Sequence, residues 1–182
     1  MSNAQGKSRF DQPSILLPAA QIRGAVAELG KQITHYAFEH KLQDLLVLGV
    51  LRGAFIFMAD LVREINYPLS VDFVIVESYQ GKMSSGGVLW GYRPQSDLEG
   101  RDVLLVEDIV ETGRTLHDVC AYLRTFSPRS LEVCTLLHKR ISSSILRPIR
   151  WVGFDIEDKF VVGYGMDLDG QYRHLPYIGW VK

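Results

Sequence analysis

The chain has 182 residues, with 20 Lys and Arg against 21 Asp and Glu, a formal charge of −1, and 47% hydrophobic residues. This balance is typical of a soluble globular protein and excludes disordered and fibrous classes. It provides no general attraction for nucleic acid or an anionic membrane, so any partner must be recognised by a local site.

A single domain over residues 1–182 is expected, because a chain of this length can bury about 70% of its unfolded surface. Residues 1–14 are expected to be a flexible N-terminal segment or a partial expression scar. The longest apolar stretch, residues 45–51, is far shorter than the ~20 residues of a membrane helix, and the start lacks an export signal. We therefore predict a cytoplasmic protein without membrane association, in which Cys120 and Cys134 are free core thiols.

Hydrophobic periodicity predicts helices and strands in alternation. Apolar strands that alternate with helices indicate an α/β fold, with a parallel sheet covered on both faces. The short strands near the C-terminal end are expected to form an accessory flap. Strands are predicted at residues 45–50, 69–79, 103–106, 131–137, 151–154 and 160–164, and helices at residues 19–39, 53–65 and 115–126.

Acidic residues follow the predicted strand at residues 103–106. Glu107 and Asp108 come directly after it, and Glu111 lies three residues further on. In an open α/β sheet, ligands bind beyond the carboxyl ends of the strands. Two adjacent carboxylates there repel each other unless hydroxyls, amides or a cation satisfy them. The arrangement suits a polyol or a divalent metal.

Residues 112–115 form the turn that leads into the next helix. An ordinary helix start, with a capping hydroxyl and a bend at Gly113, would explain this turn but not the acids before it. Consecutive backbone N–H groups at a helix N-terminus, with two threonine hydroxyls, suit a phosphate dianion. A segment that suits sugar hydroxyls at its acidic end and a phosphate at its helix end indicates ribose 5-phosphate as the ligand. The glycine patterns of Walker and dinucleotide-binding loops are both missing from the sequence.

Residues 103–115 resemble the phosphoribosyl pyrophosphate loop of the type I phosphoribosyltransferases. Five further segments resemble motifs of the hypoxanthine-guanine branch, and of its bacterial members in particular. They follow in the same order along the chain, at residues 49–55, 77–87, 136–139, 158–167 and 172–179. The resemblance extends from about Ile15 to Val181 and implies a parallel-sheet core flanked by helices, with a small hood built from the chain ends. It also implies purine salvage, in which phosphoribosyl pyrophosphate and hypoxanthine, or guanine, yield the nucleotide and pyrophosphate.

The resemblance assigns roles around the sugar and its phosphates. Glu107 and Asp108 would hold the ribose hydroxyls, with Mg2+ on or near them, and Asp167 would anchor the magnesium. The pyrophosphate would be held by Leu51, Arg52 and Gly53, where the family often has a cis peptide, and by Arg173; the 5′-phosphate would be held by Glu111, Thr112, Gly113, Arg114 and Thr115.

For the base, the resemblance implies that Lys139 meets the purine 6-oxo group, Phe160 stacks on the ring and Val161 bonds it through the backbone. Ser78 and Tyr79 would belong to a mobile loop that closes over the reacting atoms. Taken alone, Phe160 is typical of a core residue, Lys139 of a solvated strand end and Asp167 of a turn. Only the joint match of these three residues to the family's motifs favours a binding pocket. All five histidines are predicted to be structural or surface residues.

Glu111 departs from the family, which usually has aspartate at this position, where the residue accepts the purine proton. Basicity is hardly altered, because the intrinsic pKa values of the two acids differ by about 0.4. The extra methylene moves the carboxylate by roughly 1 Å, which can cost on the order of a hundredfold in rate where geometry is tight. We expect activity to be retained, because the backbone can adjust and a water can bridge. Arg52 likewise stands where lysine is common, and keeps the charge.

Some proteins of this fold instead use the phosphoribosyl site for sensing and bind nucleic acid to regulate genes. The charge of −1 and the lack of a basic stripe with interleaved aromatics disfavour that alternative. We therefore expect no nucleic-acid partner. The family typically forms dimers or tetramers, so a homodimer or homotetramer is expected. The densest basic cluster is Lys139, Arg140, Arg147 and Arg150.

Overall fold

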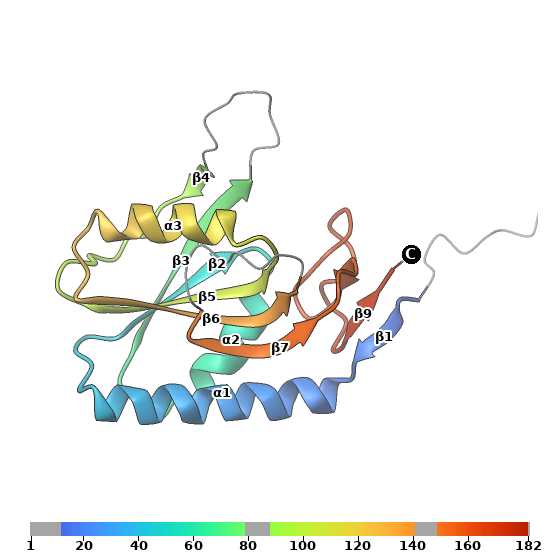
Figure 1. Cartoon of the computed structure of the whole chain (residues 1–182), viewed down its shortest axis with the longest axis horizontal. Coiled ribbons are helices and arrows are strands. Elements are labelled where there is room, and N and C mark those ends of the chain that lie inside the picture. The colour runs from blue at the N-terminus through green and yellow to red at the C-terminus, as the bar shows by residue number, and fades with distance from the viewer. Residues whose placement is uncertain (1–11, 79–87, 141–148, 182) are drawn as a thin grey trace, which may run out of the picture.

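The computed structural model describes residues 12–78, 88–140 and 149–181. Figure 1 shows its helices and strands in chain order. Their bounds are β1 Ser14–Leu17, α1 Ala19–Glu39, β2 Leu46–Leu51, α2 Phe55–Glu64, β3 Ser70–Ser78, β4 Val88–Tyr92, β5 Asp102–Val110, α3 Arg114–Arg124, β6 Ser130–Lys139, β7 Trp151–Ile156, β8 Val161–Val162 and β9 Ile178–Trp180.

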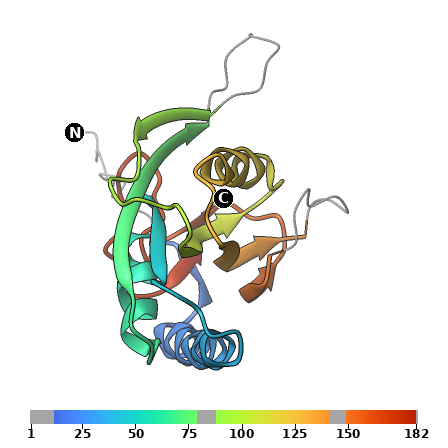
Figure 2. The same ribbon diagram turned by 90° about the vertical axis from the view of Figure 1, so that its left-hand side faces the viewer.

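Six of the described strands form the main sheet, in the order β4-β3-β2-β5-β6-β7. All neighbours pair in parallel except the edge strand β4, which is antiparallel to β3. Helix α3 covers one face, and α1 and α2 cover the other (Figures 1 and 2). Because both faces are covered, β2 and residues 103–106 of β5 are continuous apolar runs and are almost wholly buried. The predicted parallel α/β core is confirmed.

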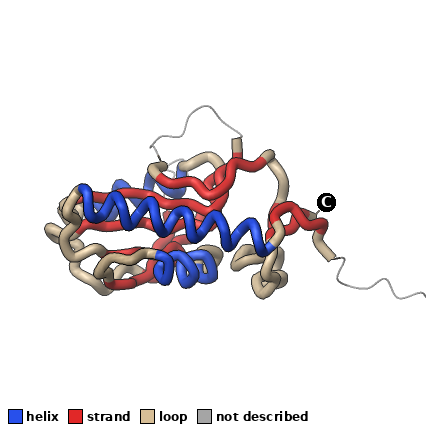
Figure 3. The backbone as a smooth tube through the Cα atoms, turned by 90° about the horizontal axis from the view of Figure 1, so that it is seen from below, coloured by secondary structure: helices blue, strands red, loops and turns tan. Residues whose placement is uncertain are grey.

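The helices turn apolar stripes toward this sheet. Helix α1 lies lengthwise along it (Figure 3), with Ile22, Val26, Leu29 and Ile33 buried at the spacing of one helical face. Helix α3 buries Cys120 on the other face, and Cys134 lies inside β6. Both cysteines are free and buried, as predicted. None of the described helices has the length and apolar character needed to cross a lipid bilayer.

A second, antiparallel sheet joins the two ends of the chain in the order β1-β9-β8. It lies at one end of the main sheet, beside the C-terminus (Figure 3), and we call this sheet, with residues 163–177, the hood. The expected flap is confirmed, although β1, β4 and β9 were not predicted as strands. The strand predicted at residues 160–164 is only two residues long, because the backbone turns at Gly163 and Tyr164, both with positive φ.

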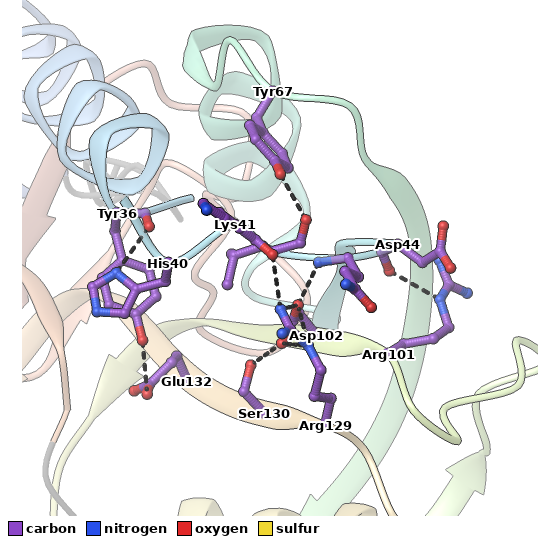
Figure 4. A network of polar contacts seen from close by, with 12 residues as sticks. Tyr36, His40, Lys41, Asp44, Tyr67, Arg101, Asp102, Arg129, Ser130 and Glu132 are labelled. Atoms are coloured by element: carbon purple, nitrogen blue, oxygen red, sulfur yellow. Dashed lines mark hydrogen bonds and ion pairs between the residues drawn. The ribbon is translucent and has the colours of Figure 1, made fainter. Parts of the chain in front are cut away.

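Asp102 opens β5 at the end opposite Glu107 and Asp108, and only 1% of it is exposed. Its carboxylate accepts hydrogen bonds from Arg129 Nε at 3.0 and 3.1 Å, from Arg129 Nη2, from the Ser130 hydroxyl and from the Gln43 backbone N–H. Figure 4 shows Arg129 and Ser130 pointing toward Asp102. Burial tends to raise the pKa of Asp102, but the hydrogen bonds outweigh it and hold that pKa below its usual value.

Replacing Asp102 by asparagine is expected to lower the free energy of unfolding by about 3 kcal/mol, which is roughly 10 °C in Tm for a chain of this size. The amide removes the charge that Arg129 and its neighbours compensate. Because the pKa is lower in the folded chain, this stabilisation is complete above the unfolded value of about 3.9 and is lost as the pH falls through the folded value. Thermal unfolding of Asp102→Asn across that pH range checks this prediction, with the exposed Asp44→Asn as the control. An equal loss of stability in both variants would contradict the role of the Asp102 network.

Candidate active site

The ends of three neighbouring strands bring the predicted site residues to one edge of the sheet. Strand β5 lies between β2 and β6 and is parallel to both, with Gly49 opposite Val106 and Glu107 opposite Thr135. The segments that follow these strands therefore emerge side by side. They carry Arg52 after β2, Glu111 after β5 and Lys139 at the end of β6.

Two adjacent cavities open at this edge, with volumes of about 470 and 300 Å³. Six residues line both, so the cavities form one continuous site: Arg52, Gly53, Asp108, Ile109, Glu111 and Asp167. The larger, which we call the sugar-phosphate cavity, is also lined by Val50, Leu51, Val76, Glu107, Val110, Thr112, Gly113, Thr115 and Leu116. The smaller, which we call the base cavity, is also lined by Lys139, Phe160, Val161, Met166 and Arg173.

Arg114 does not belong to this lining. Arg114 is the first residue of α3 and is exposed outside both cavities. Ser78 ends β3, and Tyr79 lies outside the described residues, so their roles in a closing loop stay predictions. All the other predicted site residues meet here.

Glu107 and Asp108 form the acidic end of the sugar-phosphate cavity. Burial raises the pKa of Asp108 to about 6, against the opposing effects of backbone hydrogen bonds and the Arg173 charge. Burial and the adjacent Asp108 raise the pKa of Glu107 well above its usual range. Two desolvated carboxylates next to each other are stabilised by hydroxyl donors or by a cation.

Gly53 lies against Asp108 and leaves no space for a side chain. A Cβ at this position would lie 2.6 Å from Cγ of Asp108 and closer still to Oδ2. The peptide bond between Leu51 and Arg52 is cis, as the family resemblance implied. The loop after β2 therefore brings its backbone directly onto the acidic residues of β5.

The turn at residues 111–113 joins β5 to α3. Gly113 has φ of +72° and precedes the helix, which has no side-chain cap. The Thr112 hydroxyl accepts from the Arg114 N–H at 3.5 Å, and the first helical bond runs from His117 N–H to the Gly113 carbonyl. Thr112, Gly113 and Thr115 of this turn line the sugar-phosphate cavity, where free N–H groups and the partial positive charge of the helix end suit a phosphate.

One side-chain contact ties the hood to α2, and two others orient Arg173 within the hood. Arg173 donates from Nη1 to the Gly165 carbonyl at 2.6 Å, and its Nη2 lies 2.6 Å from Oδ1 of Asp167. The Tyr164 hydroxyl donates to Oδ2 of Asp60 in α2 at 2.6 Å, and burial, followed by this bond, raises the pKa of Tyr164. The Tyr164–Asp60 bond joins residues 163–173 to α2, and the ion pair with Asp167 orients Arg173 beside the base cavity.

The base cavity has a cation at one side and an aromatic ring at another. Lys139 is 6% exposed, and its ammonium pairs with Glu111 and, at 3.3 Å, with Asp158. Phe160 is 52% exposed and Val161 is buried in β8. The exposure of Phe160 excludes its reading as a core residue, and the burial of Lys139 excludes a solvated strand end. An ammonium and a ring at one cavity suit a planar base with a carbonyl oxygen.

The oxygen ligands at this edge fit Mg2+, which prefers one or two carboxylates together with substrate oxygens. Asp108, Glu107 and Asp167 all line the sugar-phosphate cavity. Within the described ranges, however, no three His, Cys, Asp or Glu side chains come close enough to hold a metal by themselves. A magnesium ion here would complete its coordination with oxygens of water or substrate.

Sequence reasoning missed three residues near the site, namely Asp60, Asp158 and Tyr164. Asp158 and Tyr164 lie inside a segment that resembles the family, but the resemblance gave neither a role. Asp60 lies on the partly exposed face of α2, where an acid is ordinary. Two of the histidines make contacts away from the cavities: His138 pairs with Asp155 at 2.8 Å, and His40 contacts the Tyr36 carbonyl.

Comparison with known proteins agrees with this geometry. Residues 16–169 match the phosphoribosyl transferase domain family. The chain is 44% identical to the hypoxanthine phosphoribosyltransferase of Salmonella typhimurium over 92% of this chain and 94% of that protein. It is 47% identical to the hypoxanthine-guanine phosphoribosyltransferase of Mycobacterium avium over 93% and 85%. A hypoxanthine phosphoribosyltransferase structure from Staphylococcus aureus superposes with a TM-score of 0.84 at 39% identity, covering 93% and 91% of the two chains.

Proposed function

Because the chain belongs to the phosphoribosyltransferase family and matches its hypoxanthine members over most of its length, we propose that it is a purine-salvage enzyme. It transfers the 5-phosphoribosyl group from phosphoribosyl pyrophosphate to hypoxanthine, and to guanine, and releases pyrophosphate. The observation that carries this proposal is the continuity of the two cavities, with Glu111 in the wall of both. A sugar phosphate in one cavity would place its anomeric carbon next to a base in the other.

The sugar side of the reaction follows from the residues around the larger cavity. Departure of pyrophosphate builds positive charge on the ribose ring, so catalysis depends on positioning and electrostatic stabilisation. Glu107 and Asp108 hold the ribose hydroxyls, residues 111–115 hold the 5′-phosphate, and Arg52 and Arg173 stabilise the leaving pyrophosphate. Mg2+, when bound through Asp108, Glu107 or Asp167, would neutralise charge on the pyrophosphate oxygens.

The base side follows from the smaller cavity. Phe160 stacks on the purine, Val161 bonds it through its backbone, and Lys139 donates to the 6-oxo oxygen, where negative charge builds as the purine nitrogen attacks. Glu111 accepts the proton that this nitrogen loses. The loop with Ser78 and Tyr79 closes over the reacting atoms and excludes water. Adenine is disfavoured, because its 6-amino group presents a donor to the Lys139 donor.

The same proposal includes the location, the oligomeric state and the partners of the enzyme. It acts in the cytoplasm as a homodimer or homotetramer and takes small-molecule substrates, with no nucleic-acid partner. The formal charge of −1 supports the last point.

Pyrophosphate release by the purified protein, with phosphoribosyl pyrophosphate and Mg2+, tests the proposal directly. Hypoxanthine, guanine, xanthine and adenine are compared side by side at equal concentration. We expect turnover with hypoxanthine first and guanine second, and turnover with adenine lower by at least about a hundredfold, since a donor facing a donor costs a few kcal/mol. Equal turnover with adenine would contradict the role of Lys139, and turnover with adenine alone would overturn the assigned substrate.

A further inference from the structure

Lys139 lies between two carboxylates that approach it from different elements. Glu111 comes from the turn between β5 and α3 and lines the base cavity. Asp158 comes from the loop between β7 and β8, and its Oδ1 lies 3.3 Å from the Lys139 ammonium. Asp158 is not part of the lining of either cavity. It therefore approaches the ammonium from outside the base cavity.

The two carboxylates differ in what the reaction demands of them. Under the proposed function, Glu111 must turn to the purine proton, and while it does so it cannot also neutralise Lys139. The Lys139 side chain is only 7% exposed, so water compensates little of its charge. A desolvated ammonium without a counter-charge is costly. Asp158 is the partner that remains.

The geometry of the donors leads to the same conclusion. An ammonium has three N–H donors. In the structure the ammonium donates a hydrogen bond to Glu111 and forms an ion pair with Asp158 at 3.3 Å, so donor capacity remains for a ligand in the base cavity. Asp158 also precedes Phe160 by two residues, so one loop carries both the stacking ring and this carboxylate.

We propose that Asp158 is the positioning residue that holds the Lys139 ammonium toward the purine 6-oxo group, and so contributes to the preference for 6-oxopurines. The inference rests on the proposed function and deepens it. Asp158 acts through Lys139 and does not touch the substrate.

Asp158→Asn tests the proposal, because the amide keeps the shape and an oxygen acceptor but removes the charge. With saturating phosphoribosyl pyrophosphate, we expect the KM for hypoxanthine to rise about fivefold, the size of effect typical of a partly exposed ion pair. The kcat should also fall, because Lys139 stabilises the charge that builds on the 6-oxo oxygen during attack. The KM for phosphoribosyl pyrophosphate should stay unchanged. Asp158→Glu should restore the KM. Glu157→Gln is the matched control, because this neighbouring exposed acid pairs with Lys159 instead of Lys139.

A second readout separates positioning of Lys139 from a general role in shaping the loop, and it needs no turnover. Calorimetry would measure binding of inosine monophosphate and of the same nucleotide without its 6-oxo group. Asp158→Asn should weaken the first about fivefold and leave the second unchanged. Equal weakening of both nucleotides, or of neither, would overturn the inference. If the parent protein binds both nucleotides but forms none, the proposed function fails, while the nucleotide comparison still decides the role of Asp158.

Discussion

Gly53→Ala is expected to lower kcat/KM by about a thousandfold while the protein still folds. The added Cβ overlaps the Asp108 carboxylate, so either Asp108 or the loop that carries Arg52 must move. A displacement of about 1 Å at a reacting group can cost on the order of a hundredfold, and here it affects the ribose and pyrophosphate contacts together. Steady-state kinetics, with circular dichroism to verify folding, measure the effect.

Gly24→Ala is the matched control for Gly53→Ala. Gly24 lies in the exposed face of α1, and apart from its chain neighbours and the nearby helix backbone no atom lies within 4 Å of the place that a Cβ would take. Alanine there should leave activity unchanged and raise the free energy of unfolding by about 0.5–1 kcal/mol, because it favours the helix. Near-normal activity of Gly53→Ala would show that close contact between the loop and Asp108 is not needed for the reaction.

Glu111→Gln is expected to reduce kcat by about a thousandfold, within the range for loss of a general base. Glutamine can still accept a hydrogen bond from Lys139, but it cannot take a proton from the purine. The pH dependence of kcat should also change in this variant, because the group that accepts the proton is gone. Identical turnover and an identical pH–rate profile would rule out Glu111 as the proton acceptor.

Glu111→Asp tests the departure from the family at the same position. Aspartate should retain activity within about tenfold of the parent, because the two acids have nearly equal basicity and the loss of one methylene changes only reach. A loss as large as that of Glu111→Gln would mean that the length of Glu111 is essential in this chain.

Much of the core could be predicted because its signals are local. The apolar run at residues 45–50 corresponds to β2 at Leu46–Leu51, since a strand buried on both faces needs an uninterrupted apolar sequence. The acids after residues 103–106 mark the site for an equally local reason, because ligands bind at strand ends. Strand β5 continues through these acids to Val110, so Glu107 and Asp108 lie within the strand rather than after it.

The missed features depend on contacts between distant segments. Strand β1 is four residues long, half of them exposed, and exists because it pairs with β9 at the other end of the chain. The Asp102 network joins residues 41, 43, 129 and 130, and no local pattern marks it. Asp158 comes near Lys139 because β7 pairs with β6, with Ile156 opposite Lys139 and Asp158 two residues further on. Periodicity carries no information about such pairings.

The most direct test of the central claim is stoichiometric product formation by the parent protein. The protein is incubated with phosphoribosyl pyrophosphate, Mg2+ and hypoxanthine, and inosine monophosphate and pyrophosphate are quantified together by chromatography. The account predicts equal amounts of both products, and neither when the base is omitted. Tight binding of phosphoribosyl pyrophosphate without any nucleotide formed would contradict it, and would indicate that the same cavities serve a sensor.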